Sequence, residues 1–143
     1  MTQLLRHHIS LWATFALVFA VLLNPLTSWA SDTVHEPVNV IHVNAEQTRD
    51  LLQQNPNFVV LDVRTKGEYK RGHIEGAVRN NYFSTKFKKR LRALDKSATY
   101  IVHCKSGHRS KRVVKTMRKE GFQNIYHMDG GYDAWKKLPP KTD

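Results

Sequence analysis

Two short apolar runs that each end in a polar residue, Phe58–Asp62 and Thr99–His103, constrain the fold most. Continuous apolar runs of this length are typical of strands that are buried on both faces, as in parallel sheets. Segments with helical periodicity or with helix-capping residues separate such runs along the chain. This alternation of strands and helices predicts an α/β fold, with a central, mainly parallel sheet flanked by helices.

The expected elements alternate from one end of the domain to the other. Strands are expected at residues 38–43, 58–62, 77–78, 99–103 and 124–128. Helices are expected at residues 45–54, after the capping box at 65–68, at 84–94, at 110–120, and from 130–131 to about 138. These elements form one domain over residues 38–140, and residues 31–37 are expected to be a flexible N-terminal segment of the mature chain.

Residues 1–30 have the pattern of a cleaved signal peptide. A short basic start precedes the apolar run Leu11–Leu23, and small residues up to Ala30 predict cleavage after that position. A retained membrane anchor is the alternative, but the run is 13 residues long and a span needs roughly 20. We therefore expect export to the periplasm, with no stable membrane anchor after cleavage.

The chain is strongly basic. It carries 23 Lys and Arg residues against 12 Asp and Glu residues, a formal net charge of +11. Such a balance suits either a nucleic-acid ligand or a cationic surface that attracts small anions. Because we expect export, we predict a protein that gathers anions and has no nucleic-acid partner.

Cys104 is the only cysteine of the chain. In an oxidising compartment a single cysteine has no partner within its own chain, so it is a free thiol, a cross-link to another chain or a functional group. Cys104 directly follows the predicted strand at 99–103. It therefore lies at the carboxyl end of a strand, which is where ligands bind in open parallel sheets. This position favours a functional thiol over an inert buried one.

The residues after Cys104 are suited to stabilise a thiolate. Gly107 allows a positive φ that turns backbone N–H groups inward, and the following helix adds unpaired N–H groups and a partial positive charge. Lys105, His108 and Arg109 add cations or donors. Such settings lower the pKa of a cysteine. We expect a thiolate that attacks an electrophilic sulfur and becomes a persulfide, with no separate general base.

Three neighbouring side chains are assigned less specific roles. His103 should lie in the core, because adjacent strand residues point to opposite faces. His108 lies at the rim of the loop that follows Cys104, and this position favours contact with substrate. Arg109 either binds an anion or fixes the loop through a carboxylate partner. The histidines show no tight metal-ligand spacing, so we expect no metal site and no cofactor.

Four motifs, in this order, carry a resemblance to a known family. They are Leu61–Arg64 with Glu68–Tyr69; Gly72–Ala77; Cys104–Ser110; and a closing signature made of Gly121–Phe122, Tyr126–Asp129 and Gly130–Trp135. Together they cover nearly the whole mature chain, which resembles a single-domain rhodanese, a thiosulfate sulfurtransferase. Export and small size make it similar to the periplasmic rhodaneses of the phage-shock protein E type.

The resemblance implies an α/β fold with a parallel sheet of about five strands, and a two-step cycle. Cys104 would take a sulfur from an anionic donor such as thiosulfate and pass it to a thiophilic acceptor such as cyanide or a thiol. The resemblance makes Lys105, Ser106, Gly107, His108 and Arg109 the substrate-binding cradle. It makes other signature residues structural: Asp62, Arg64, Glu68, His73, Gly76 and Trp135.

Two positions depart from the family pattern. Arg79 stands where the family usually has asparagine, with Asn80 and Asn81 following it, and this change bears on the turn beneath the site. Glu75 occupies a position where proline is frequent, which should matter little.

Two other functions remain as alternatives. A phosphatase of the same fold needs its arginine six positions after the cysteine, and Arg109 is five positions after Cys104. A sulfur-carrier or redox-partner module is the other alternative, because some rhodanese domains are thought to serve in binding or regulation.

Overall fold

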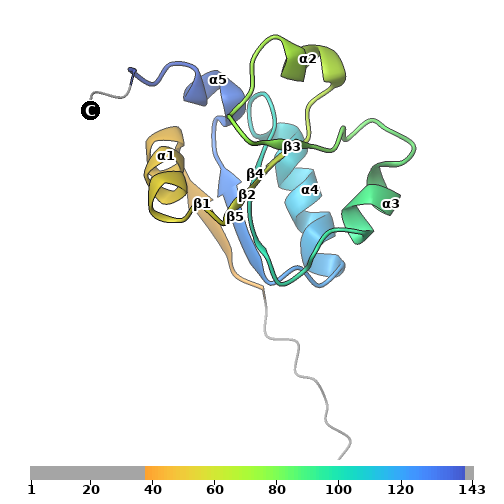
Figure 1. Ribbon diagram of the computed structural model, residues 1–143. Helices are drawn as coiled ribbons and strands as arrows, with labels where there is room; N and C mark the ends of the chain where they lie inside the picture. Colours follow the sequence, from red (N-terminus) through yellow and green to blue (C-terminus); the bar gives the residue numbers. More distant parts are fainter. Residues whose placement is uncertain (1–37, 141–143) are drawn as a thin grey trace, which may run out of the picture. The chain divides into compact units, whose positions relative to one another are not determined.

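The computed structural model describes residues 38–140, which form a five-stranded parallel sheet of order β1-β5-β4-β2-β3 (Figure 1). The central strand is β4, so the segment that follows it emerges from the middle of the sheet. The strands are β1 (Val40–Val43), β2 (Val59–Asp62), β3 (Val78–Arg79), β4 (Thr99–His103) and β5 (Asn124–Met128). The α/β class and the five-stranded parallel sheet expected from the sequence are confirmed.

Helices cover both faces of the sheet. They are α1 (Ala45–Gln54), α2 (Lys66–Lys70), α3 (Phe87–Arg92), α4 (His108–Lys119) and α5 (Gly131–Trp135). Figure 1 shows α3 and α4 on one side of the sheet and α1 on the other. Each side has its own core: residues of α3 and α4 pack with one apolar cluster, and residues of α1 and α5 with the other.

Side-chain alternation along β4 divides its residues between these two cores. Tyr100 and Val102 belong to the cluster under α3 and α4, whereas Ile101 belongs to the cluster under α1 and α5. All three are nearly or fully inaccessible to solvent. Burial of both faces explains why the sequence of β4 is continuously apolar.

Two helix starts follow from capping boxes. The Asn44 side chain accepts from the Gln47 amide at 2.8 Å, and the Gln47 side chain accepts from the Asn44 amide at 2.9 Å. Thr65 and Glu68 make the same reciprocal pair at the start of α2. Both helices begin where the sequence predicts, because these local bonds satisfy amides that no helix carbonyl reaches.

Several predicted boundaries are wrong by one to three residues; for example, β1 begins at Val40 instead of residue 38. Helix α3 begins at Phe87 instead of residue 84, because Ser84 closes a turn: its carbonyl accepts from the Phe87 amide at 2.9 Å. Helix α4 begins at His108, two residues earlier than predicted, because Gly107 at φ +97° is its N-cap. Strand β3 lies one residue later, and α5 ends at Trp135, beyond which the chain continues in tighter turns.

Two further expectations concern residues 1–37, which lie outside the described residues: the signal peptide and the flexible segment that follows it. Within residues 38–140, no helix is long and apolar enough to cross a membrane. The expectations about cleavage and export therefore remain predictions.

The start of α5 packs directly against the segment after β4. The amides of Tyr132 and Asp133 donate to the carbonyls of Cys104 and Lys105 at 2.8 and 2.9 Å. Gly131 makes this approach possible, since a Cβ at that position would lie 2.5 Å from the Cys104 oxygen and 2.6 Å from the Lys105 oxygen. Its φ of +57° is also one that side chains rarely adopt.

We expect Gly131→Ala to lower the free energy of unfolding by roughly 2–4 kcal/mol, because it adds a backbone clash to the cost of positive φ. Gly76→Ala is the matched control, since Gly76 has a φ of +71° but nothing lies within 4 Å of its Cβ position. That control should cost only about 1–2 kcal/mol. Urea denaturation measures both values, and equal losses in the two variants would contradict the close packing of α5.

Candidate active site

Cys104 lies at the carboxyl end of the central strand. It directly follows β4, and its residue is 1% exposed. The side chain belongs to the cluster under α4, whose first residue is His108. The thiol is therefore enclosed by the short loop Lys105–Gly107 and by the first turn of α4.

Hydrogen-bond donors from this loop and helix surround the Cys104 sulfur. The Gly107 amide donates to Sγ at 3.2 Å, and the Ser110 hydroxyl donates to it at 3.6 Å. Burial by itself raises the pKa of the thiol, but hydrogen bonds from the Ser110 amide and hydroxyl and from the Ser106 and Gly107 amides outweigh it. The pKa of Cys104 is therefore lowered, which favours the thiolate.

The orientation of these amides follows from the contact with α5. A trans peptide unit points its N–H and C=O in opposite directions. The Lys105 carbonyl points to the Asp133 amide, so the Ser106 N–H of the same peptide unit points the other way, toward the sulfur. The left-handed Gly107 then turns the chain into α4, whose N-terminus adds a partial positive charge.

Arg109 is held by Glu68 in a two-pronged ion pair. Its Nη1 and Nη2 atoms donate to the two Glu68 oxygens at 2.9 and 2.5 Å, and both side chains are 18% exposed. The pKa of Arg109 is raised mainly by this hydrogen bonding to Glu68, and also by the nearby Cys104 sulfur. Arg109 thus has the carboxylate partner that fixing the loop requires, whereas its role in binding an anion stays a prediction.

Glu68 links this ion pair to α2. Its Oε2 also accepts from the Thr65 amide at 3.0 Å and from the Thr65 hydroxyl at 2.7 Å. Hydrogen bonding to Arg109 is the largest cause that lowers the pKa of Glu68 from 4.5 to about 2, and the Thr65 bonds add to it against the effect of burial. The capping box of α2 thus orients the carboxylate that holds the cysteine loop.

The remaining members of the predicted cradle form its exposed rim. Lys105, Ser106 and His108 are exposed, and the Ser106 hydroxyl lies 3.3 Å from His108 Nδ1. A pocket of about 490 Å³ adjoins this rim. It is rich in cations, and its lining residues are Arg64, Glu68, Arg71, Lys105, Tyr132, Asp133 and Lys136.

A buried ion pair between Asp62 and Arg64 packs next to the site. Asp62 at the end of β2 accepts from the Arg64 backbone amide at 2.8 Å and from Arg64 Nη2 at 2.6 Å. The Arg64 guanidinium lies 4.0 Å from the ring centre of Tyr132 in α5. His103 is fully buried, as expected for a core residue, and burial is the main cause that lowers its pKa.

The turn beneath the site forms even though Arg79 replaces the asparagine of the family pattern. Asn80, the next residue, is buried: its amide donates to the Asp62 carbonyl at 2.9 Å and its side chain donates to the Phe87 carbonyl at 3.3 Å. An asparagine thus makes hydrogen bonds to both β2 and α3, but it stands one residue later in the sequence than in the family pattern.

Two contributors to the site could not be inferred from the sequence. Ser110 ends the sequence motif that begins at Cys104, but no pattern indicated that its hydroxyl reaches the Cys104 sulfur. On the other side, that hydroxyl lies 2.9 Å from His127 Nε2, and His127 Nδ1 lies 2.9 Å from Asp129. Burial is the main cause that lowers the pKa of His127. No local pattern signals this contact, because Ser110 and His127 are far apart in the chain.

The fold and the site together define a class of protein: α/β domains that hold one buried cysteine in a ring of amides between a central strand and a helix. The family model of the rhodanese-like domain matches residues 44–138. The chain belongs to the rhodanese family.

Individual relatives agree with this assignment. The chain is 31% identical to rhodanese-like domain-containing protein 17 of Arabidopsis thaliana, over 91% of this chain and 89% of the relative. It is 35% identical to the thiosulfate sulfurtransferase GlpE of Pseudomonas fluorescens, over 57% of this chain and 73% of the relative. The solution structure of the rhodanese-like domain of Alr3790 from Anabaena matches with a TM-score of 0.60 and 26% identity, over 76% of this chain and 88% of that one.

Membership of this family does not by itself specify a substrate. The relatives also include a tRNA uridine(34) hydroxylase of Sodalis glossinidius, which is 29% identical over 70% of this chain and 30% of its own length. The sulfurtransferase relatives support sulfur transfer at the level of the family, with a sulfur donor and a sulfur acceptor as partners.

We expect Cys104 to react with iodoacetamide with a pH midpoint below that of an ordinary cysteine, because the surrounding donors favour the thiolate. Ser110→Ala should raise this midpoint by removing one donor. Ser106→Ala should leave it unchanged, because the Ser106 side chain is directed to His108 and only its backbone amide serves the sulfur. Equal midpoints in the wild type and in Ser110→Ala would contradict the role of the hydroxyl.

The Glu68–Arg109 pair should make stability depend on pH in acid. The folded-state pKa of Glu68 is lowered from 4.5 to about 2, so its contribution is complete above about 4.5 and is lost as the pH falls toward 2. In Glu68→Gln this part of the pH dependence should be absent from urea denaturation curves. Glu75→Gln, at an exposed position, is the control and should keep the wild-type pH dependence; a Glu68→Gln curve parallel to the wild type would contradict the ion pair.

Proposed function

We propose that the protein is a thiosulfate sulfurtransferase that works through a persulfide on Cys104. The observation that carries this proposal is the buried Cys104 sulfur in its ring of backbone and hydroxyl donors. Membership of the rhodanese family and similarity to a thiosulfate sulfurtransferase support it.

In the first step the Cys104 thiolate attacks the outer sulfur of thiosulfate. A sulfur–sulfur bond forms to Cys104, the sulfur–sulfur bond of thiosulfate breaks, and sulfite leaves with its electron pair. The product is a persulfide anion on Cys104. Its charge would be stabilised by the same amides of Ser106 and Gly107 that stabilise the thiolate, so no side chain needs to move a proton.

In the second step a thiophilic acceptor attacks the outer sulfur of the persulfide. With cyanide the products are thiocyanate and the Cys104 thiolate, so the enzyme returns to its starting state. A thiol acceptor would take the sulfur in the same way. The acceptor must approach from the exposed rim formed by Lys105, Ser106 and His108, because the other sides of Cys104 are covered by the core.

The charge of the rim favours an anionic donor. Lys105 is an exposed residue of the loop, and Arg71 and Lys136 line the adjoining pocket. Arg109 is already paired with Glu68, so it contributes less to binding than its charge suggests. Lys105 and the loop amides are then the main groups that would attract thiosulfate.

We also propose that the protein is exported and acts in the periplasm after cleavage near Ala30. The support is the basic start, the apolar run Leu11–Leu23 and the small residues before Ser31. N-terminal sequencing of the protein isolated from cells tests this proposal. A mature chain that begins at Ser31 is expected, and an intact N-terminus in the periplasmic fraction would contradict cleavage.

Intact-mass measurement tests the first step of the reaction. After treatment with thiosulfate, the wild type should gain the mass of one sulfur atom, and cyanide should remove it. Cys104→Ser should gain nothing. If the wild type gains no sulfur, sulfurtransfer fails at its first step, and turnover of a phosphotyrosine analogue would then favour the phosphatase alternative. A persulfide that forms but passes to no small acceptor would favour a sulfur-carrier module.

Lys105→Ala should raise the KM for thiosulfate by roughly two- to fivefold and change kcat little, because an exposed ion pair is worth up to about 1 kcal/mol. Lys119→Ala is the matched control: it removes the same charge from the exposed far end of α4. Steady-state kinetics at low and high ionic strength should show the difference only at low salt. An equal effect of the two variants would show that overall charge, and not the rim, attracts the donor.

A further inference from the structure

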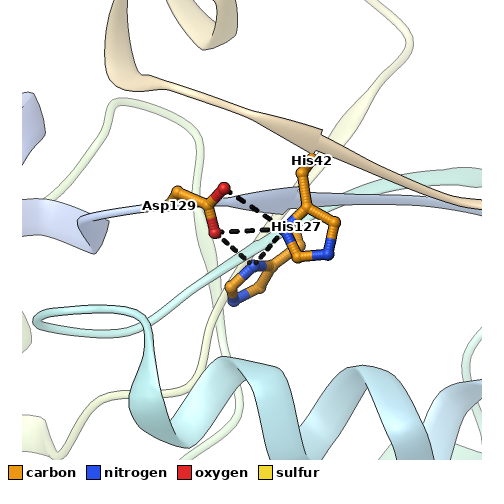
Figure 2. A group of neighbouring side chains, drawn as sticks. All are labelled: His42, His127 and Asp129. Atoms are coloured by element: carbon orange, nitrogen blue, oxygen red, sulfur yellow. Dashed lines mark hydrogen bonds and ion pairs between the residues drawn. The ribbon is translucent and has the colours of Figure 1, made fainter.

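Two histidines and one aspartate lie together at the carboxyl end of β1 and β5. His42 and His127 are direct neighbours in the register of these two parallel strands, so their side chains lie on the same face of the sheet. Asp129 is two residues after His127 and therefore points to that face as well. Figure 2 shows the three side chains converging on one point.

The three groups have the spacing of ligands around one metal ion. His127 Nδ1 lies 2.9 Å from Asp129 Oδ1 and 3.4 Å from His42 Nδ1, and His42 Nδ1 lies 3.1 Å from the same Asp129 oxygen. A tetrahedral zinc ion with bonds of about 2.0–2.1 Å holds its ligand atoms about 3.3 Å apart. Small side-chain movements would therefore suffice to admit such an ion.

The cluster is anchored on one side and open on the other. The His127 side chain is 3% exposed, whereas those of His42 and Asp129 are each 55% exposed. Within residues 38–140, the ion pairs of Asp129 are with these two histidines, and no Lys or Arg side chain neutralises it. An ion could enter from solvent and keep a water molecule as its fourth ligand.

The donor set also selects the kind of metal. Two imidazole nitrogens and one carboxylate oxygen suit divalent ions of the zinc and copper group, whereas magnesium and calcium prefer sites made of oxygen alone. We propose that His42, His127 and Asp129 bind one divalent transition-metal ion, and that this ion influences Cys104 through Ser110. The spacing of the histidines along the chain hides this site, since His42 and His127 are 85 residues apart.

The connection to Cys104 runs through the second nitrogen of His127. Its Nε2 lies 2.9 Å from the Ser110 hydroxyl and 3.3 Å from the Gly107 carbonyl. When Nδ1–H donates to Asp129, Nε2 is unprotonated and competes with the Gly107 carbonyl and the Cys104 sulfur for the one Ser110 proton. A metal ion bound to Nδ1 uses the lone pair of that nitrogen, so Nδ1 can no longer carry a proton. The proton of the neutral ring then lies on Nε2, which becomes a hydrogen-bond donor.

This change of tautomer redirects the Ser110 hydroxyl. Once Nε2 donates, the Ser110 proton has two remaining acceptors, the Gly107 carbonyl at 3.0 Å and the Cys104 sulfur at 3.6 Å. Metal binding therefore increases the share of molecules in which Ser110 donates to the sulfur. The thiolate is stabilised, and more of Cys104 is reactive at a pH below its midpoint.

Zinc titration of the untagged protein by calorimetry tests the site. It is done in a Cys104→Ser background, so that the thiol cannot be the ligand. One zinc ion per chain is expected, with micromolar or tighter affinity that excess magnesium does not reduce. His42→Ala should weaken this binding about tenfold or more, because it removes one ligand.

His73→Ala is the matched control, because His73 is also exposed but stacks on Tyr69 away from the cluster. It should bind zinc like the parent. Asp129→Asn should weaken binding while keeping the size of the side chain. If zinc does not saturate one site, or if His42→Ala binds it as tightly as the parent does, the metal site is overturned and the cluster is a hydrogen-bonded network only.

Alkylation of Cys104 tests the connection separately from any sulfur transfer. At a pH below the midpoint, zinc should speed the reaction of the wild type with iodoacetamide about two- to fivefold and leave His42→Ala unchanged. Ser110→Ala should bind zinc but lose the acceleration. Cobalt(II) in place of zinc should show no sulfur-to-cobalt charge-transfer band. Such a band, or the same rate with and without zinc in the wild type, would overturn the connection.

Discussion

Two hydrogen bonds from the first turn of α5 to the carbonyls of Cys104 and Lys105 are the constraint on which the site depends. They turn these carbonyls away from the sulfur, and the planarity of the peptide then turns the following amide toward it. The bonds require a close approach that leaves no room for a side chain at Gly131. Gly131 thus shapes the loop that follows Cys104, although the two lie far apart in the chain.

The arrangement stabilises negative charge mainly with backbone dipoles. Arg109, in the first turn of α4, forms an ion pair with Glu68 and thereby holds the loop in place. Fixed amides would suit the proposed alternation of this sulfur between thiolate and persulfide, because they stabilise either anion without rearranging. In the function that we propose, the exposed cations at the rim would have a different task, which is to attract an anionic donor. Behind α4, the contact from Ser110 to His127 extends this network to a second cluster of ionisable groups.

Much of the fold was predictable from the sequence, because its signals are local. Continuous apolar runs gave the buried strands β2 and β4, and the capping boxes at Asn44 and Thr65 gave the starts of α1 and α2. The position of Cys104 at the carboxyl end of a central strand was predictable from the apolar run that precedes it. The start of α3 was not, because Ser84 closes a turn as readily as it caps a helix. The partners of Arg109, Ser110 and His127 were not predictable either, since each is fixed by packing between distant segments.

The central claim is that the amides of Ser106, Gly107 and Ser110 hold the charge of the Cys104 sulfur. The most direct measurement is the chemical shift of these three amide protons, followed by NMR as the pH is raised. All three should move together with one midpoint, below that of an ordinary cysteine, and should not move in Cys104→Ser. Amide shifts that ignore the ionisation of Cys104, or that persist in the serine variant, would contradict the account.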